Sequence, residues 1–449
     1  MKFLKQKALL STALIGLAFA APAMAQNSPT LQTLRDAVAT GVATNPEYGV
    51  VASSRRATDE ELNQANALYL PSVDLNADTG FEYTEDPATR AGAGDDDESM
   101  YRYETGLTLT QLLFDGYETK YEVERQQNRV NSASHRVRET AEFIGLDIVE
   151  AYLEVLRQRQ LVQISRDNVS AHIDILSQIQ EGVEAGRSTQ ADVEQANARL
   201  ARAQATESDA REALRVAESQ YMRDVGDMPK DLTVPRTPYD KLARTVDLEV
   251  EQSLTQSPTL DVLEADVRVA DAEFNGTQST MYPQVDLQLN ARQGHDLGGV
   301  DGRDRSASSL VVMNWNLYRG GGDMARAREF AHRVQQKKEE RADAARSIED
   351  DVRRTWASKI AASERSSAFE RQVLANREVV AAYRDQFELN RRTLLDVLDA
   401  QNELFVSRSN AINSRFVEMT AVYRLLALKG ELLPTLGVEY PRESIAAKM

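Results

Sequence analysis

The chain has 449 residues, no cysteine, and a formal net charge of −17 from 53 Lys and Arg against 70 Asp and Glu. This acidic balance argues against nucleic acid as a partner, because binding to phosphates needs a basic footprint. The lack of cysteine excludes disulfides and the usual attachment point of a bacterial lipid anchor, so packing or oligomerisation must hold an exported chain together.

Residues 1–25 predict a secretory signal peptide, with the mature chain starting at Gln26. Its parts occur in order, namely a basic stretch, an apolar run and a small-residue cleavage site (Lys2, Lys5 and Lys7; Ala8 to Ala20; Ala23-Met24-Ala25). A buried N-terminal helix is the alternative. No later stretch has the composition of a transmembrane helix, so contact with a membrane would require a β-barrel or a surface-bound element.

After N-terminal helices in residues 26–69, period-two alternation of apolar and polar residues predicts four strands. They are Ser72 to Tyr83, Tyr101 to about Leu113, a stretch that starts at Gln284, and about Ser306 to Leu317. The first alternates strictly, whereas Leu310 and Val312 blur the polar face of the fourth.

The length of these segments is close to the roughly 10 residues of a tilted membrane strand. Aromatic residues near their ends are typical of an interfacial girdle, and these are Phe81, Tyr83, Tyr101, Tyr103 and Trp315. A half-buried strand of a soluble sheet also alternates, so that alternative stays open. Residues 84–100 and 293–305 are expected to be long polar connections within the two hairpins. The acidic run from Asp95 to Glu98 fits a solvated loop better than a cation site, because it lacks the glutamate that closes an EF-hand.

Very long helices are expected from about Tyr117 to Glu181 and from about Ala325 to Leu389. The first would extend about 100 Å at 1.5 Å per residue, about three times a hydrocarbon core, and it is too polar to lie in lipid. A last helix carries apolar residues every seven positions, which predicts left-handed coiled-coil packing. These are Leu398, Phe405, Ile412, Met419 and Leu426.

The chain also repeats itself. Leu70-Pro71-Ser72-Val73-Asp74-Leu75 recurs as Tyr282-Pro283-Gln284-Val285-Asp286-Leu287, and the segment from Gly186 to Val193 recurs from Asn390 to Val397. Each half is therefore expected to contain a helix, a β-hairpin, a very long helix, a tight turn and a returning helix.

This order of elements resembles the TolC family of outer-membrane channels over about residues 30–432. The most specific motifs are Leu317-Tyr318-Arg319-Gly320-Gly321 at a strand-to-helix junction and Arg392-Thr393-Leu394-Leu395-Asp396-Val397-Leu398-Asp399-Ala400 at a helical turn. The family usually has proline where Asn316 stands, but the turn glycines Gly116, Gly320 and Gly321 remain.

The resemblance implies a mainly α fold with a membrane β-barrel contribution. Three chains would supply four strands each to a 12-stranded barrel, and their helices would form a periplasmic tube. Closure by symmetric copies also removes strand edges that lipid does not tolerate. The expected divisions are 1–25 signal peptide, 26–69 N-terminal helices, 70–115 first β-hairpin, 116–225 first helical hairpin, 226–281 equatorial segment, 282–319 second β-hairpin, 320–432 second helical hairpin and 433–449 tail.

The implied function is a passive exit duct in the outer membrane, in contact with its lipid, for type I protein secretion. Its partners would be a periplasmic adaptor and an inner-membrane transporter driven by ATP. The alternatives are the same duct serving small-molecule efflux, or a soluble periplasmic coiled-coil scaffold. Neither an enzyme nor a cofactor is expected, because the four histidines lack metal-ligand spacing and no catalytic motif occurs.

The resemblance places the functional site at the turn that ends the tube. Asp396 and Asp399 match the carboxylates of the family's periplasmic constriction, and their spacing puts both on one helix face. Acidic rings from three copies would favour cations in the pore. Helix capping is the alternative explanation for Asp396, and also for Asp192, because each acid follows a threonine by three residues.

Asp192 and Arg392 match positions of the network that holds this constriction shut. Phe387 stands where the family has tyrosine, and Ala191 where it has threonine. Because both hydroxyls are lost, a weaker latch is expected, held mainly by Asp192, Arg392 and packing.

Overall fold

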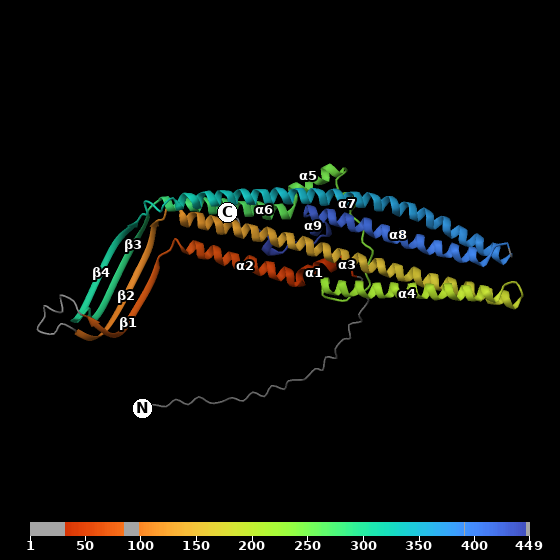
Figure 1. The fold of residues 1–449 in the computed structure, drawn as a ribbon, viewed down its shortest axis with the longest axis horizontal. Coiled ribbons are helices and arrows are strands. Elements are labelled where there is room, and N and C mark those ends of the chain that lie inside the picture. The colour runs from red at the N-terminus through yellow and green to blue at the C-terminus, as the bar shows by residue number, and fades with distance from the viewer. Residues whose placement is uncertain (1–31, 85–97, 390, 446–449) are drawn as a thin grey trace, which may run out of the picture.

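Helices run along most of the length of the molecule, and a curved β-sheet lies at one end (Figure 1). This computed structural model describes residues 32–84, 98–389 and 391–445. The predicted signal peptide, residues 1–25, lies outside the described residues, as do Asp95, Asp96 and Asp97 of the acidic run. Glu98, the last residue of that run, begins the second strand. The predicted class, mainly helical with four strands in each chain, is confirmed.

The sheet is antiparallel with the strand order β1-β2-β3-β4. Its strands are β1 (Ser72–Thr84), β2 (Glu98–Phe114), β3 (Gln284–Leu297) and β4 (Val300–Asn314). Pairing of β2 with β3 joins the two hairpins, with a register shift between Leu112 and Phe114. The outer edges of β1 and β4 have no neighbouring strand within the described chain.

The connection between β3 and β4 corrects one prediction, because residues 293–305 do not form a long loop. The strands continue to Leu297 and from Val300, so that Gly298 and Gly299 alone make the turn. Their φ angles of 58° and 75° are the positive values that a two-residue type I′ hairpin requires. The fourth strand ends at Asn314, so Trp315 follows the strand instead of lying within it.

Helices α3 (Glu118–Glu184) and α7 (Gly322–Glu388) have 67 residues each, or about 100 Å at the usual rise. They return through α4 (Gln190–Val225) and α8 (Leu394–Lys429), as predicted. Within the described residues, no helix combines the length and apolar composition that crossing a bilayer requires.

Both long helices follow a left-handed turn. Gly116 has φ 68°, and Gly320 and Gly321 have φ 64° and 82°. A β-carbon on Gly116 would lie 2.7 Å from the carbonyl oxygen of Ser279. In place of the family's proline, the side-chain oxygen of Asn316 accepts a hydrogen bond from the amide of Tyr318 (3.2 Å).

The main core lies midway along the molecule, where α3 is surrounded by other helices. They include α1 (Leu34–Thr44), α8 and α9 (Leu432–Leu436), while α2 (Pro46–Ala67), α5 (Val246–Gln256) and α6 (Pro258–Gly276) complete the bundle. Tyr152 is fully buried, and its hydroxyl lies 2.9 Å and 2.7 Å from the carbonyl oxygens of Gln32 and Thr233. It thereby fixes the extended segment that crosses the bundle between α4 and α5 (Figure 1).

Candidate functional site

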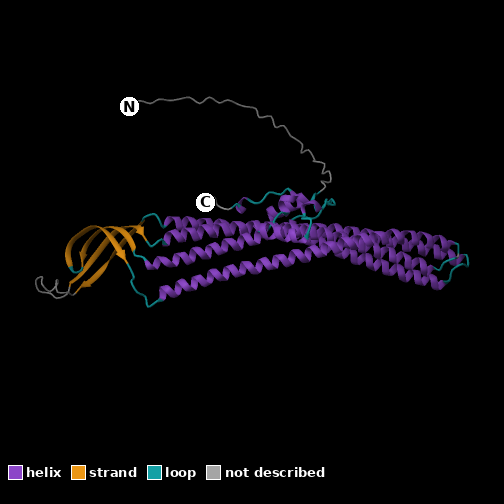
Figure 2. Ribbon diagram, turned by 90° about the horizontal axis from the view of Figure 1, so that it is seen from above, coloured by secondary structure: helices purple, strands orange, loops and turns teal. Residues whose placement is uncertain are grey.

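The two helical hairpins turn at the end of the molecule opposite the sheet (Figure 2). Each returning helix starts with a capping box, in which Thr189 pairs with Asp192 and Thr393 pairs with Asp396. The Asp192 carboxylate accepts a hydrogen bond from the Thr189 amide (2.8 Å), and the Asp396 carboxylate accepts one from the Thr393 amide (3.2 Å). Capping is therefore confirmed as a role of both acids.

Apolar side chains from α3, α4 and α8 hold the two tips together. The buried members are Ile175, Ile179, Val193, Ala196, Leu394, Val397 and Leu398. Phe387 and Tyr383 of α7 pack against this cluster. Phe387, a predicted network residue, therefore contributes packing, as expected of a ring without a hydroxyl.

Arg392 lies against the end of its own hairpin. Its guanidinium is 4.2 Å from the ring centroid of Tyr383, its Nε donates to Gln386 (3.0 Å), and an Nη lies 3.8 Å from the Asp396 carboxylate. Hydrogen bonds from Thr393, aided by the Arg392 charge, hold the pKa of Asp396 below its usual value. Within the described residues, no contact joins Arg392 to Asp192.

Asp399 lies one turn beyond Asp396 and makes a contact that the sequence did not predict. Its carboxylate pairs with Arg199 of α4 at 3.1 Å, and 56% of its side chain remains exposed. The ion pair links the first helical hairpin to the second across 200 residues of chain. A second link joins Asp167 of α3 to Arg408 of α8 at 3.0 Å.

The sheet at the opposite end has one charged face. Arg102 contacts three carboxylates, those of Asp78 (2.8 Å), Glu104 (2.6 Å) and Glu82 (3.4 Å). Arg292 of the next strand contacts Glu104 (3.4 Å) and Asp304 (3.5 Å). Because these residues come from all four strands, the network crosses the whole sheet.

The other face is apolar and exposed. In one cross-strand row, Leu75 lies opposite Leu107, which in turn lies opposite Ala291. The predicted aromatic residues Phe81, Tyr83, Tyr101 and Tyr103 lie toward the end of the sheet far from the helices, whereas Trp315 follows β4 at the near end. Phe81 and Tyr101 are in edge-to-face contact, with centroids 5.2 Å apart.

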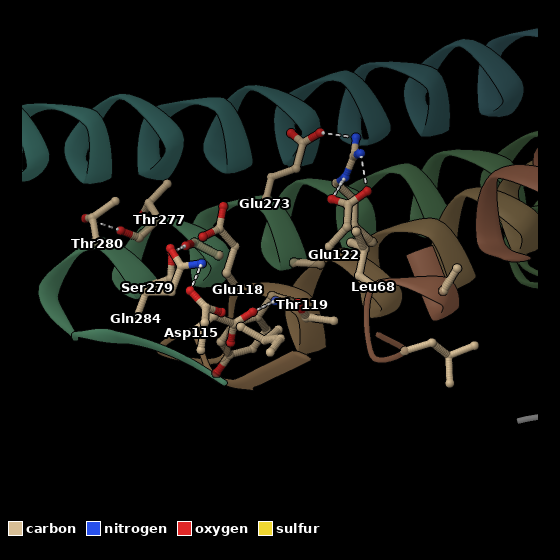
Figure 3. Close-up of a pocket in the computed structure, with 18 of the residues that line it drawn as sticks. Leu68, Asp115, Glu118, Thr119, Glu122, Glu273, Thr277, Ser279, Thr280 and Gln284 are labelled. Carbon is tan, nitrogen blue, oxygen red and sulfur yellow. Dashed lines mark hydrogen bonds and ion pairs between the residues drawn. The ribbon is translucent and has the colours of Figure 1, made fainter. Parts of the chain in front are cut away.

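A pocket of about 740 Å³ lies where the sheet meets the helices (Figure 3). Arg125 bridges Glu122 (2.7 Å) and Glu273 (3.6 Å) there, and the Asp115 carboxylate accepts a hydrogen bond from the Thr119 amide (2.7 Å). The charged groups of Arg125 and Asp115 are therefore paired with other groups of the same chain and do not point to a ligand. Within the part of the chain that the structure describes, no group of three or more His, Cys, Asp or Glu residues could hold a metal ion.

Comparisons with known proteins agree with this architecture. A family model described as outer membrane efflux protein matches residues 42–225 and 250–431. The outer membrane efflux protein BepC of Brucella suis is 25% identical over 89% of this chain and 86% of its own length. The alkaline protease secretion protein AprF of Pseudomonas aeruginosa is 23% identical over 86% of this chain and 82% of its own length.

The fold is also similar to solved structures. The Campylobacter jejuni CmeC outer membrane channel superposes with a TM-score of 0.77 at 11% identity, covering 89% of this chain and 86% of that one.

Proposed function

Because the chain belongs to the outer membrane efflux protein family, which includes TolC, we propose that it forms the exit duct of a tripartite export machine. Like its relatives, the protein is an outer-membrane channel protein and not an enzyme. The predicted alternative of a soluble periplasmic scaffold is wrong for a member of this family.

The two-faced sheet with two open edges is the observation that carries the proposal. Unpaired backbone groups on β1 and β4 are costly in lipid, and only closure removes them. Three copies around an axis would pair β4 of one chain with β1 of the next, giving a 12-stranded barrel. The charged face around Arg102 and Arg292 would line a water-filled lumen, and the apolar face would meet lipid.

The strands and helices have the dimensions for this arrangement. The 13 residues of β1 extend about 40 Å, sufficient to cross an apolar band of about 25 Å when tilted. The long helices would continue the lumen into the periplasm as a tube.

The tips of the helices would form the gate of this tube. Asp396 and Asp399 of three copies would place carboxylates around the axis, where they favour cations over anions. Within one chain, Asp192 and Arg392 brace their own turns, and packing of Phe387 joins the hairpins. Any direct contact of Asp192 with Arg392 would therefore have to form between copies.

Conductance of the purified channel in planar bilayers tests both duct and gate. We expect cation-selective channels with a low resting conductance, raised several-fold by the double substitution Arg392→Ser with Asp192→Ala. Arg391→Ser with Glu194→Ala, which changes the same charges on the same turns, is the control. Equal resting conductance in the Asp192 and Arg392 variant and the wild type would refute the latch, and a lack of any conductance would refute the duct.

Type I protein secretion is the cargo class we propose first, with an ATP-driven inner-membrane transporter and a periplasmic adaptor as partners. Its support is the sequence resemblance and the likeness to AprF, a protein named for protease secretion. Small-molecule efflux is the second candidate, because BepC is named an efflux protein. Deletion of the gene separates them: loss of a secreted protein supports the first, and increased drug sensitivity alone supports the second.

A further inference from the structure

Two arginines lie on the apolar face of the sheet. Arg303 of β4 is opposite His295 of β3, which is opposite Tyr103 of β2. Arg305 is opposite Gln293, which is opposite Thr105. Directly opposed residues of antiparallel strands project to the same side. Both arginines therefore share the face of Leu107 and Ala291, not the face of the Arg102 network.

The charges of the two faces are strongly asymmetric. The carboxylates with described side chains in the regularly paired strands project from the charged face, and these are Asp74, Asp78, Glu82, Glu104, Asp286 and Asp304. Arg102 and Arg292 are each paired with more than one of them. Arg303 and Arg305 are exposed and make no hydrogen bond or ion pair with another described residue.

The position of Arg303 and Arg305 along the strands indicates which layer of the membrane they contact. Arg303 is at the level of the Tyr103 ring, which stacks on His295 with centroids 5.6 Å apart. This level belongs to the aromatic belt at the end of the sheet far from the helices. In a barrel whose helices lie in the periplasm, that end reaches the headgroups of the outer leaflet, where aromatic side chains are enriched.

We propose that Arg303 and Arg305 bind the phosphate groups of an anionic lipid of the outer leaflet, an inference that rests on the proposed barrel. A guanidinium on an apolar face can extend toward the interface while its methylene groups stay in lipid. Arginine and phosphate form charge-assisted, often bidentate hydrogen bonds. In the rows of directly paired residues, Arg303 and Arg305 are the only Lys, Arg, Asp or Glu side chains on the apolar face of the described strands, and Asp296 and Asp301 lie beyond these rows, past the register shift. The complement of the two arginines is therefore an anion, and lipid is what covers this face in the proposed barrel.

The test measures affinity of the purified protein in detergent micelles for bisphosphorylated lipid A and for its dephosphorylated form, by native mass spectrometry. The wild type should bind the phosphorylated lipid about 30-fold more tightly, as expected for two arginines near an anionic surface. Arg303→Gln with Arg305→Gln should abolish this preference. Arg303→Lys with Arg305→Lys should keep most of it.

Arg365→Gln with Arg371→Gln is the matched control, because it removes two exposed positive charges from α7 and should leave the preference unchanged. Inorganic phosphate at millimolar concentration should not compete, and full competition would assign the site to free phosphate and overturn the lipid assignment. Equal affinity of the wild type for both lipids would also overturn the inference, whether or not the variants fold. Conductance of the same preparations tests the duct separately, so conducting channels without a lipid preference would contradict this inference alone.

Discussion

The carboxyl group of Glu142 joins two parts of the chain that lie 290 residues apart. The fully buried side chain accepts hydrogen bonds from the amides of Leu432 (3.0 Å) and Leu433 (3.4 Å) at the start of α9, and from the Tyr440 hydroxyl. Burial disfavours the charged form and raises the pKa of Glu142 to about 7, despite these bonds. The residue therefore makes the docking of the C-terminal segment sensitive to pH.

The sign of this dependence follows from the two pKa values. Below pH 4.5, the ordinary value, the folded and unfolded chains are both protonated at this site. Between 4.5 and about 7 only the folded chain keeps the proton, so the free energy of unfolding falls as the pH rises, by roughly 3 kcal/mol in total, and it then levels off.

Glu142→Gln should remove this slope, because the amide resembles the protonated acid. Its oxygen can accept hydrogen bonds from the α9 amides. Its NH₂ can donate to the Tyr440 oxygen, because the single Tyr440 hydroxyl proton can turn from residue 142 to the Gly430 carbonyl, which lies 2.7 Å away. Apparent melting temperatures in detergent from pH 5 to 8 measure the effect. Glu139→Gln, which affects a carboxylate bonded to Thr259, should keep the wild-type slope. An unchanged slope in Glu142→Gln would contradict the assignment.

Arg199 determines how much of the Asp399 charge is available to the proposed gate. An exposed ion pair contributes only about 0–1 kcal/mol to stability, so Arg199→Gln should leave the fold intact. Three uncompensated carboxylates should bind cations more strongly. We expect Mg²⁺ to block the channel at a several-fold lower concentration in planar bilayers. Adding Asp399→Asn should reverse the gain, and block that is indifferent to both changes would exclude Asp399 from the pore.

At the scale of elements, the junctions between the strands and the long helices are the positions where replacing a glycine should be most destabilising. Gly116 combines a positive φ with close contacts to Ser279 and Tyr282, whereas Gly322 begins α7 with open space around it. A side chain is therefore excluded at the first glycine and tolerated at the second.

Gly116→Ala should destabilise the folded protein by about 2 kcal/mol or more, because a β-carbon would lie 2.7 Å from two atoms in a left-handed backbone. Gly322→Ala should be neutral or slightly stabilising, since alanine favours the helix. Yield and melting temperature of the folded protein compare the two. Similar values for both variants would show that the junction can relax around Gly116.

At the scale of the whole molecule, the sheet is too narrow to close on itself. Strands β1 and β4 lie three strand spacings apart, or about 14 Å, while a disulfide needs α-carbons within about 7 Å. A short cross-link between these strands should therefore form only between copies.

Asn76→Cys with Ser306→Cys or Ser308→Cys, oxidised to a disulfide, should give dimer and trimer bands in a denaturing gel without reductant. The cysteine-free chain makes this test clean. Leu75→Cys with Leu107→Cys is the control, because these residues are direct partners and should link only within a monomer. Monomer bands alone from the β1 and β4 pairs would contradict closure by symmetric copies.

The sequence by itself determined the helices, the four strands, the capping boxes at Thr189 and Thr393, and the family. These depend on periodicity and spacing over a few residues, where backbone geometry leaves few choices. The prediction from local sequence was wrong at residues 293–305, where the glycines indicated a long loop. Two of them instead form the type I′ turn, and Gly294 lies within β3, where a β-carbon would lie 2.6 Å from the Leu297 side chain.

The tertiary structure alone decided which distant residues meet. No spacing rule links Arg199 to Asp399 or Glu142 to Tyr440, because each pair forms only after helices far apart in the chain have packed. The same holds for the pairing of β2 with β3, which joins the two hairpins into one sheet. It also separates the paired Arg102 and Arg292 from Arg303 and Arg305, which have no ion pair among the described residues. Alternation assigns a residue to one side of a strand, but only the register between strands decides what lies beside it.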